Sequence, residues 1–232
     1  QGGMIILPHA LQLTVHRDTA ELAVAVARRI AALIEQAIAA RGVCRIALAG
    51  GSTPRRCYEQ LSALPVEWAR VQIYFGDERC LPAGDAERND EMARRSLLQH
   101  IAIPAANVRV IEAERGAVPA AADYAARLQA VLPLDVVLLG MGEDGHTASL
   151  FPGNPALSAT AAAVPVFDAP KPPAERVSLS LATLNTARHK LFLVAGQSKQ
   201  DALARIAAGE VLPAAQVTDG EWHLDRDVVP NI

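Results

Sequence analysis

Apolar side chains along the chain follow two different spacings, one typical of helices and one typical of buried strands. Between residues 19 and 40, apolar side chains recur every three or four positions, and Gly42 follows. This spacing predicts one long helix that Gly42 terminates. The same helical spacing is found at 54–61, 87–100, 119–132, 180–187 and 199–208.

Short apolar runs separate these predicted helices. They lie at 45–49 (RIALA), 71–75 (VQIYF), 108–111 (VRVI), 134–139 (LDVVLL) and 191–195 (LFLVA). Several are apolar at consecutive positions, which is typical of strands covered on both faces in a parallel sheet. Because strands alternate with helices, we predict an α/β fold with a mostly parallel sheet. The proline-rich segment 165–173 is predicted to be a loop, and 210–232 favours neither element.

The length and composition indicate an ordinary globular protein. The 232 residues contain no internal repeat or clear linker, so we expect one domain over 1–232, with residues 1–3 as an expression remnant before Met4. No apolar run reaches the roughly 20 residues of a membrane helix, and no signal peptide follows Met4, so we expect a cytoplasmic protein without membrane contact. The net charge of -3 and the lack of a clustered basic face argue against nucleic-acid binding.

The three cysteines form no recognisable metal or redox motif. Cys44, Cys57 and Cys80 show no CxxC pairing and no histidine at zinc-ligand spacing. An odd number of cysteines is typical of a reducing compartment. Cys80 is a possible nucleophile, but no neighbouring basic residue would lower its pKa, so we predict a reduced structural cysteine.

Four of the predicted strands end in the same way, with glycine followed by polar or charged residues. The sequences after the strands are GGSTP, GDER, GMGEDGHT and GQSK. In open parallel sheets, ligands bind outside the carboxyl ends of the strands, so we expect these four ends to meet at one crevice. Ordinary turn chemistry accounts for any one of them. It does not explain why together they supply Asp, Glu, Arg, His and Lys.

The first of these segments, 50–54, is suited to a phosphate group. Gly51 allows backbone N–H groups to approach an anion, and Ser52 and Thr53 supply hydroxyls. Pro54 fits the first turn of the following helix, whose N-terminus favours negative charge. The segment is neither a P-loop nor a nucleophile elbow, and a purely structural turn is the alternative interpretation.

The segment 140–145 matches GxGxxG, but we reject a dinucleotide site there. Such a site needs a long helix directly after the third glycine, and Pro152 and Gly153 would stop it. His146 also occupies the position where that motif requires close helix packing. Asp168 has a suitable spacing for a ribose contact, but it lies in the proline-rich loop.

His146 differs from the other histidines, His9, His16, His100, His189 and His223, which we interpret as structural. It lies in a glycine-rich loop after a strand, flanked by Asp144 and Thr147. Histidine titrates near neutral pH and can take a proton from water, so we predict His146 as a general base. Asp77 and Asp144 are both candidates to orient its ring. The sequence does not choose between them.

Four segments resemble, in order, the conserved blocks of 6-phosphogluconolactonase. They are 49–61 (AGGSTPRRCYEQL), 74–82 (YFGDERCLP), 140–153 (GMGEDGHTASLFPG) and 176–199 (RVSLSLATLN…LFLVAGQSK). The resemblance implies a Rossmann-like three-layer α/β/α domain, shared with glucosamine-6-phosphate deaminase and ribose-5-phosphate isomerase A. It also implies hydrolysis of 6-phospho-D-glucono-1,5-lactone to 6-phosphogluconate in the pentose phosphate pathway, with no metal and no cofactor.

The resemblance also implies roles for individual residues. It makes His146 the proton-transfer residue and places Asp77 in the same site. The phosphate end would comprise Arg79, Lys199, Gly51, Ser52 and Thr53. Backbone N–H groups of the 142–145 loop, including Gly142, or a nearby cation are candidate donors to the carbonyl oxygen. The chain departs from the family pattern at 80–89, so Asn89 is left without a firm role.

Two other functions are compatible with this fold. An amino-sugar-phosphate deaminase would read Asp-Glu-Tyr at 77–79 and would carry a further carboxylate at 151, where this chain has Phe151. A non-catalytic sugar-phosphate sensor would usually carry a DNA-binding segment, and no helix-turn-helix precedes Thr19. We therefore expect a small sugar-phosphate substrate, and a monomer or weak homodimer.

Overall fold

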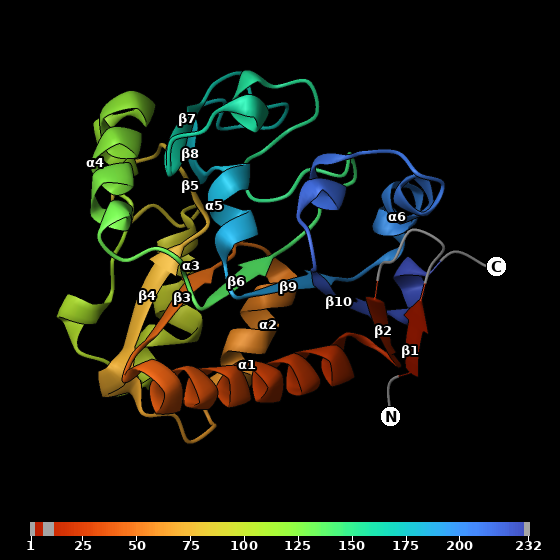
Figure 1. The fold of residues 1–232 in the computed structure, drawn as a ribbon, viewed down its shortest axis with the longest axis horizontal. Coiled ribbons are helices and arrows are strands. Elements are labelled where there is room, and N and C mark those ends of the chain that lie inside the picture. The colour runs from red at the N-terminus through yellow and green to blue at the C-terminus, as the bar shows by residue number, and fades with distance from the viewer. Residues whose placement is uncertain (1–2, 7–11, 230–232) are drawn as a thin grey trace.

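In the computed structural model, residues 3–6 and 12–229 are described, and most of their strands form one sheet (Figure 1). The sheet has seven strands in the order β1-β2-β10-β9-β6-β3-β4. The strands are β1 (Gly3–Ile6), β2 (Gln12–His16), β3 (Cys44–Leu48), β4 (Val71–Phe75), β6 (Val136–Leu139), β9 (His189–Val194) and β10 (Glu221–Asp225). Among the described strands of this sheet, only β1 pairs antiparallel, which confirms the predicted α/β fold with a mostly parallel sheet.

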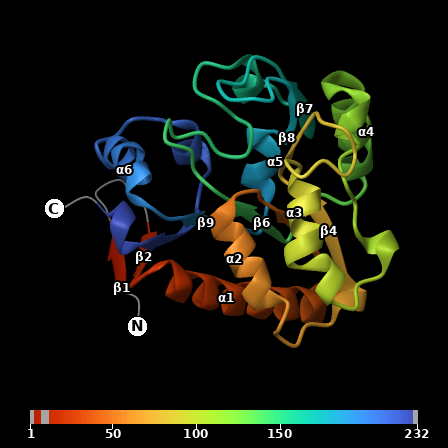
Figure 2. The same ribbon diagram turned by 180° about the vertical axis from the view of Figure 1, so that it is seen from behind.

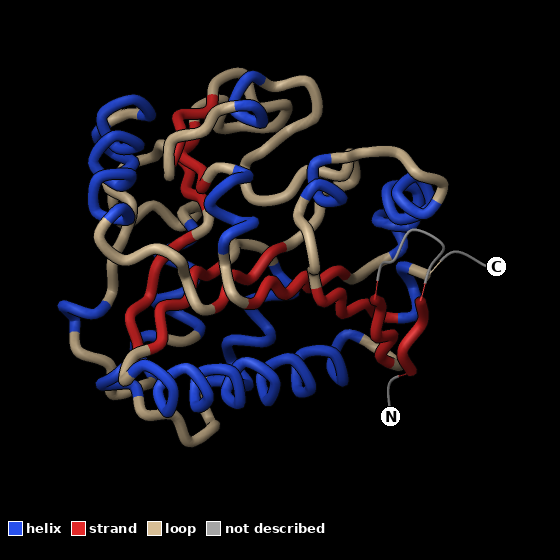
Figure 3. Tube along the Cα trace, viewed as in Figure 1, coloured by secondary structure: helices blue, strands red, loops and turns tan. Residues whose placement is uncertain are grey.

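Helices cover the sheet on both sides. They are α1 (Thr19–Arg41), α2 (Ser52–Leu61), α3 (Asn89–Ser96), α4 (Ala117–Gln129), α5 (Leu181–Thr186) and α6 (Gln200–Ala207). Figure 2 shows α1, α2 and α3 close together, and Figure 3 shows long loops on the side of the sheet opposite α1. None of the helices in the described part of the chain is long and apolar enough to cross a membrane.

Helix α1 shows how the sequence sets an element's limits. The Asp18 side chain accepts a hydrogen bond from the Glu21 N–H at 2.8 Å and caps the first turn. Gly42 ends the helix with φ of 79°, a conformation that glycine adopts at little cost, and its N–H donates to Ile38 O. The apolar side chains of the inward face are buried; they include Leu22, Val26, Ile30, Leu33 and Ile34.

A second, smaller sheet was not predicted. It is antiparallel, in the order β5-β8-β7, and comprises β5 (Asp77–Arg79), β7 (Ala163–Val166) and β8 (Arg176–Leu179). The predicted loop at 165–173 is therefore wrong at its start, because Pro165 and Val166 belong to β7. These strands are three or four residues long and pair with distant segments, so they show no periodic pattern.

The predicted strand at 108–111 is also wrong. Only Val108 pairs with β4, opposite Ile73, and the Arg109 N–H donates to Ile73 O at 2.8 Å. The chain then leaves the sheet edge between two short 3₁₀ turns at Ala105–Asn107 and Ala113–Arg115. The segment 210–232, without a clear prediction, contributes β10. His9 and residues 1–2 lie outside the described residues.

Candidate active site

A cavity of about 480 Å³ lies at the carboxyl ends of the parallel strands. It is lined by residues from all four strand ends that the sequence pattern singled out, as expected for a parallel sheet. The predicted site residues in its lining are Gly51, Ser52 and Thr53 after β3, Asp77 and Arg79 after β4, Gly142 and His146 after β6, and Lys199 after β9. Asp144 is outside this lining and contacts His146 instead.

His146 and Asp144 form a tight pair. The Nδ1 atom of His146 lies 2.6 Å from Oδ1 of Asp144, and the backbone N–H of His146 donates to the same oxygen at 3.0 Å. Burial by itself would raise the pKa of Asp144, but these two hydrogen bonds outweigh it and lower the pKa. An ionised Asp144 requires a proton on Nδ1, which leaves Nε2 of His146 as the basic nitrogen.

The loop that carries His146 is held by hydrogen bonds and close packing among its own residues, 142–146. A Cβ atom on Gly142 would lie 2.0 Å from both Cε1 and Nδ1 of His146, so only glycine leaves room for the imidazole. The Gly142 N–H donates to His146 O, and the Gly145 N–H donates to Gly142 O, both at 2.9 Å. These two amides are thus occupied within the loop, which favours a cation over them as the donor to a substrate carbonyl.

Asp77 occupies a separate position with its own partners. Its Oδ1 accepts from Nδ2 of Asn89 at 3.1 Å, and its Oδ2 accepts from the Ser149 hydroxyl at 2.6 Å. Asn89 in turn packs against Gly50, where a Cβ atom would lie 2.1 Å from the Asn89 amide oxygen. The structure thus assigns the contact with His146 to Asp144, and it holds Asp77 through two residues that sequence analysis left without a role.

Positive charge predominates in the cavity lining. The charged residues are Arg79, Lys171, Arg176 and Lys199, against the carboxylates of Asp77 and Glu143. This leaves an excess of two positive charges, which suits a phosphate dianion. The Nη1 group of Arg79 donates to Glu87 O at 2.6 Å, and its Nε is buried with no acceptor among the described residues. Burial lowers the pKa of Lys199.

Arg176 and Lys171 belong to the site but were not predicted. Arg176 is buried, and burial lowers its pKa, against the favourable charge of Asp77. Its guanidinium donates to Pro173 O at 3.1 Å and to Lys171 O at 3.0 Å. These hydrogen bonds fix the loop segment 171–173, from which Lys171 lines the cavity. Arg176 opens one of the four conserved blocks, and that position was the only available signal.

The Cys80 thiol and the arrangement of possible metal ligands provide no further catalytic group among the described residues. Burial raises the pKa of Cys80 to about 11, so its thiol stays protonated at neutral pH and is a poor nucleophile. In the described ranges, no group of three or more His, Cys, Asp or Glu side chains is arranged to hold a metal ion.

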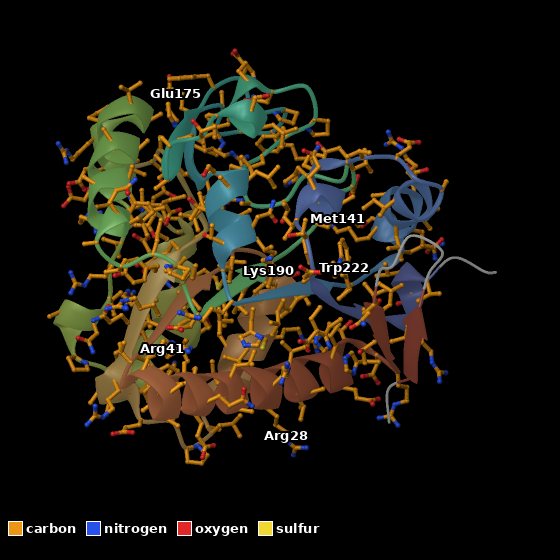
Figure 4. The ribbon with its side chains drawn as sticks, viewed as in Figure 1. Arg28, Arg41, Met141, Glu175, Lys190 and Trp222 are labelled. Atoms are coloured by element: carbon orange, nitrogen blue, oxygen red, sulfur yellow. The ribbon has the colours of Figure 1, made fainter. Side chains whose placement is uncertain are left out.

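A second cavity, of about 220 Å³, lies at the opposite edge of the sheet. There Asp135 binds Arg41 at 2.6 Å and approaches Arg188 at 3.5 Å. In Figure 4, Arg41 lies near the end of α1, well away from Met141 in the lining of the main cavity. We attribute this cluster to stability of the fold.

The fold and the main cavity together define an α/β protein whose cavity carries excess positive charge and a histidine paired with a carboxylate. The family model for glucosamine-6-phosphate isomerases/6-phosphogluconolactonase matches residues 17–225, and the chain belongs to this family. The 6-phosphogluconolactonase of Mycobacterium tuberculosis is 38% identical over 236 residues, covering 93% of this chain and 96% of the relative. That of Rattus norvegicus is 38% identical and covers 89% and 86%.

Solved structures of 6-phosphogluconolactonases have the same fold as this chain. The 6-phosphogluconolactonase from Trypanosoma cruzi superimposes with a TM-score of 0.84 at 31% identity, covering 93% of this chain and 94% of that chain. The one from Thermotoga maritima gives 0.86 at 27% identity, covering 92% and 99%. A monomeric glucosamine-6-phosphate deaminase also superimposes, with a TM-score of 0.83 at 20% identity over 94% and 98% of the two chains, which shows a shared fold.

Proposed function

We propose that this chain is a lactone hydrolase that converts 6-phospho-D-glucono-1,5-lactone to 6-phospho-D-gluconate, the step of the pentose phosphate pathway carried out by its named relatives. The observation that carries the proposal is the His146–Asp144 pair beside a cavity with excess positive charge. Family membership alone leaves two activities open, since the family includes isomerases acting on an amino-sugar phosphate.

His146 acts as the general base in this mechanism. Asp144 holds the proton on Nδ1, and Nε2 takes a proton from a water molecule as its oxygen attacks C1 of the lactone. The carbonyl oxygen gains negative charge, which a cationic side chain of the cavity stabilises. The bond from C1 to the ring oxygen then breaks, and the protonated imidazole returns its proton to that oxygen. The product is the open-chain hydroxy acid, whose carboxyl group then releases its proton to solvent and becomes the carboxylate.

The phosphate end of the substrate provides positioning. Arg79 and Lys199 both line the cavity, where they supply a guanidinium and an ammonium group. The loop at 51–53 adds the first turn of α2. No side chain caps this turn, and Gly51, Ser52 and Thr53 line the cavity, as is favourable for an anion at a helix N-terminus. Binding energy at the phosphate holds C1 beside His146 and lowers the entropic part of the barrier.

The position of Phe151 favours lactone hydrolysis over deamination. A deaminase of this fold carries an additional carboxylate there for ring opening and proton shuttling. In this chain the buried Phe151 ring packs against the His146 imidazole, with centroids 4.5 Å apart. An apolar ring in that position cannot exchange protons with an amino sugar.

Three assays test the proposal. Phosphorylated lactone generated in situ should disappear faster than its spontaneous hydrolysis when the protein is present, and no acceleration would refute the activity. His146→Ala should lower kcat by roughly 10²–10⁴-fold, whereas His100→Ala at the surface should not. Full activity of His146→Ala would refute the general-base role. Release of ammonia from glucosamine 6-phosphate would identify a deaminase instead.

A further inference from the structure

Asp225, at the end of β10, is a buried carboxylate beside the loop that carries Lys199. It is 2% exposed. Strand β10 runs parallel to β9 with Leu224 opposite Val194, so both chains leave the sheet side by side. After β9 the chain turns at Gly196, with φ of 99°, into the 3₁₀ turn Gln197–Lys199 and then α6. Figure 1 shows the end of β10 close to α6.

The carboxylate of Asp225 joins three separate segments. Its Oδ1 accepts from the Gly196 N–H at 3.2 Å and from the Val228 N–H at 3.3 Å, and its Oδ2 accepts from the Thr19 hydroxyl at 3.1 Å. No ion pair of the described residues includes Asp225, so neutral donors alone compensate its charge. Hydrogen bonds to an ionised acceptor are stronger and more directional than neutral ones.

The hydrogen bond to Gly196 leads directly to the phosphate end of the cavity. The Lys199 N–H donates to Gly196 O at 3.1 Å, so the turn that begins at Gly196 sets the backbone position of Lys199. A second contact reinforces this link, since Nε2 of Gln200 donates to Asp227 O at 2.6 Å. The end of β10 and the residues after it therefore hold the 196–200 segment at its first and last residues.

We infer that Asp225 is a positioning residue for the phosphate end of the site. It fixes the Gly196 turn and thereby keeps the Lys199 ammonium directed into the cavity. The inference rests on the proposed function, in which Lys199 binds the substrate phosphate. Asp225 itself does not contact the substrate, and it therefore affects binding of the phosphate more than the chemical step at His146.

The variant Asp225→Leu tests this role. Its side chain is close in size to that of Asp but accepts no hydrogen bond, so the Gly196 N–H loses its acceptor. We expect KM for the lactone, and the inhibition constant of inorganic phosphate, to rise about tenfold, with kcat close to that of the wild type. Thr19→Val is the matched control because it removes only the hydrogen bond to α1, and it should leave KM unchanged.

Two results would overturn the inference. One is an unchanged KM in folded Asp225→Leu; the other is an equal rise of KM in Thr19→Val, which would indicate a general effect at α1. If Asp225→Leu does not fold, hydrogen exchange in the wild-type protein decides instead. The Gly196 amide should be protected, and exchange at the rate of a free amide contradicts the inference. Lys199→Met separates the two proposals: an unchanged KM in that variant refutes phosphate binding by Lys199 itself.

Discussion

The contact between Asp144 and His146 predicts which carboxylate supports the general base. Asp144→Asn replaces the acceptor of Nδ1–H by an amide that can stabilise the wrong tautomer, so Nε2 would lose its basic lone pair. We expect kcat to fall by roughly 10²- to 10³-fold, within the 10²–10⁴-fold that a positioned base contributes. Steady-state kinetics with the lactone measure this loss.

The same substitution at the surface provides the control. Asp123 lies on α4 and pairs with Arg127 away from the cavity. The substitution Asp123→Asn should therefore leave kcat unchanged. A normal kcat in Asp144→Asn, combined with a large loss in Asp77→Asn, would show that the ring is oriented by Asp77 in the active conformation.

The lowered pKa of Lys199 predicts that substrate binding weakens at alkaline pH. Burial lowers the pKa of its ammonium group below the usual value, so the charge that binds the phosphate is present at low pH and is lost as pH rises through the lowered pKa. We therefore expect KM to increase on the alkaline side. Lys199→Arg should move this increase to higher pH, because a guanidinium keeps its proton. Identical pH profiles of KM for the two proteins would exclude Lys199 as the titrating group.

At this scale the sequence predicted which residues meet, but not how they pair. His146, Asp77, Arg79 and Lys199 each follow a strand, and the parallel sheet brings such positions together. The partner of His146 depends on the closed 142–146 turn, which is a matter of loop geometry and has no periodic signal. Asn89, Arg176 and Ser149 were missed for the same reason, because each acts through one specific contact.

Among the elements, α3 depends on a carboxyl group from another segment. Glu78 in β5 is fully buried and accepts from the N–H groups of Arg79, Asn89 and Asp90, at 2.9, 2.7 and 2.9 Å. It thus caps α3 at its first turn and fixes Asn89, which in turn holds Asp77. The Asp-Glu-Arg segment therefore supplies a site residue, a helix cap and a cavity cation in succession.

Glu78→Gln tests this capping role. The amide nitrogen cannot accept a hydrogen bond, so at least one buried N–H of the first turn loses its partner. We expect the free energy of unfolding to fall by about 1–3 kcal/mol, with a lower activity as Asn89 shifts. Urea unfolding with an unchanged m-value measures this. Glu91→Gln, whose partners Arg94 and Arg95 are exposed, should cost less than about 1 kcal/mol. Equal losses in the two variants would contradict the cap.

The elements that sequence analysis predicted and those that it missed differ in how they are stabilised. Helix α1 shows a clear pattern because it buries one apolar stripe in the main core, and strand β6 shows one because it is buried on both faces. Strands β5, β7 and β8 are stabilised by pairing across large sequence separations, and β5 consists of charged residues. Their pairing could be found only once the main sheet had placed them together.

Across the whole molecule, the two edges of the main sheet have different tasks. The carboxyl edge carries the cavity, and the opposite edge carries Asp135, which is buried and contacts three other segments. Its Oδ1 binds Arg41 of α1 and approaches Arg188 before β9, and its Oδ2 accepts from the Arg45 N–H of β3 at 2.8 Å. Residues at this edge are far from the substrate, so they should affect stability and leave the chemistry unchanged.

Asp135→Ala tests this separation of stability from activity. The substitution leaves the Arg45 N–H without its acceptor and releases Arg41, so the free energy of unfolding should fall by about 1–3 kcal/mol. Because the cavity is built from the other ends of the same strands, kcat and KM of the folded variant should equal those of the wild type. Arg188→Gln removes only a half-exposed partner and should cost less than about 1 kcal/mol. Asp135 does not line the cavity. A changed KM in folded Asp135→Ala would therefore contradict the separation and show that the two edges are coupled through the sheet.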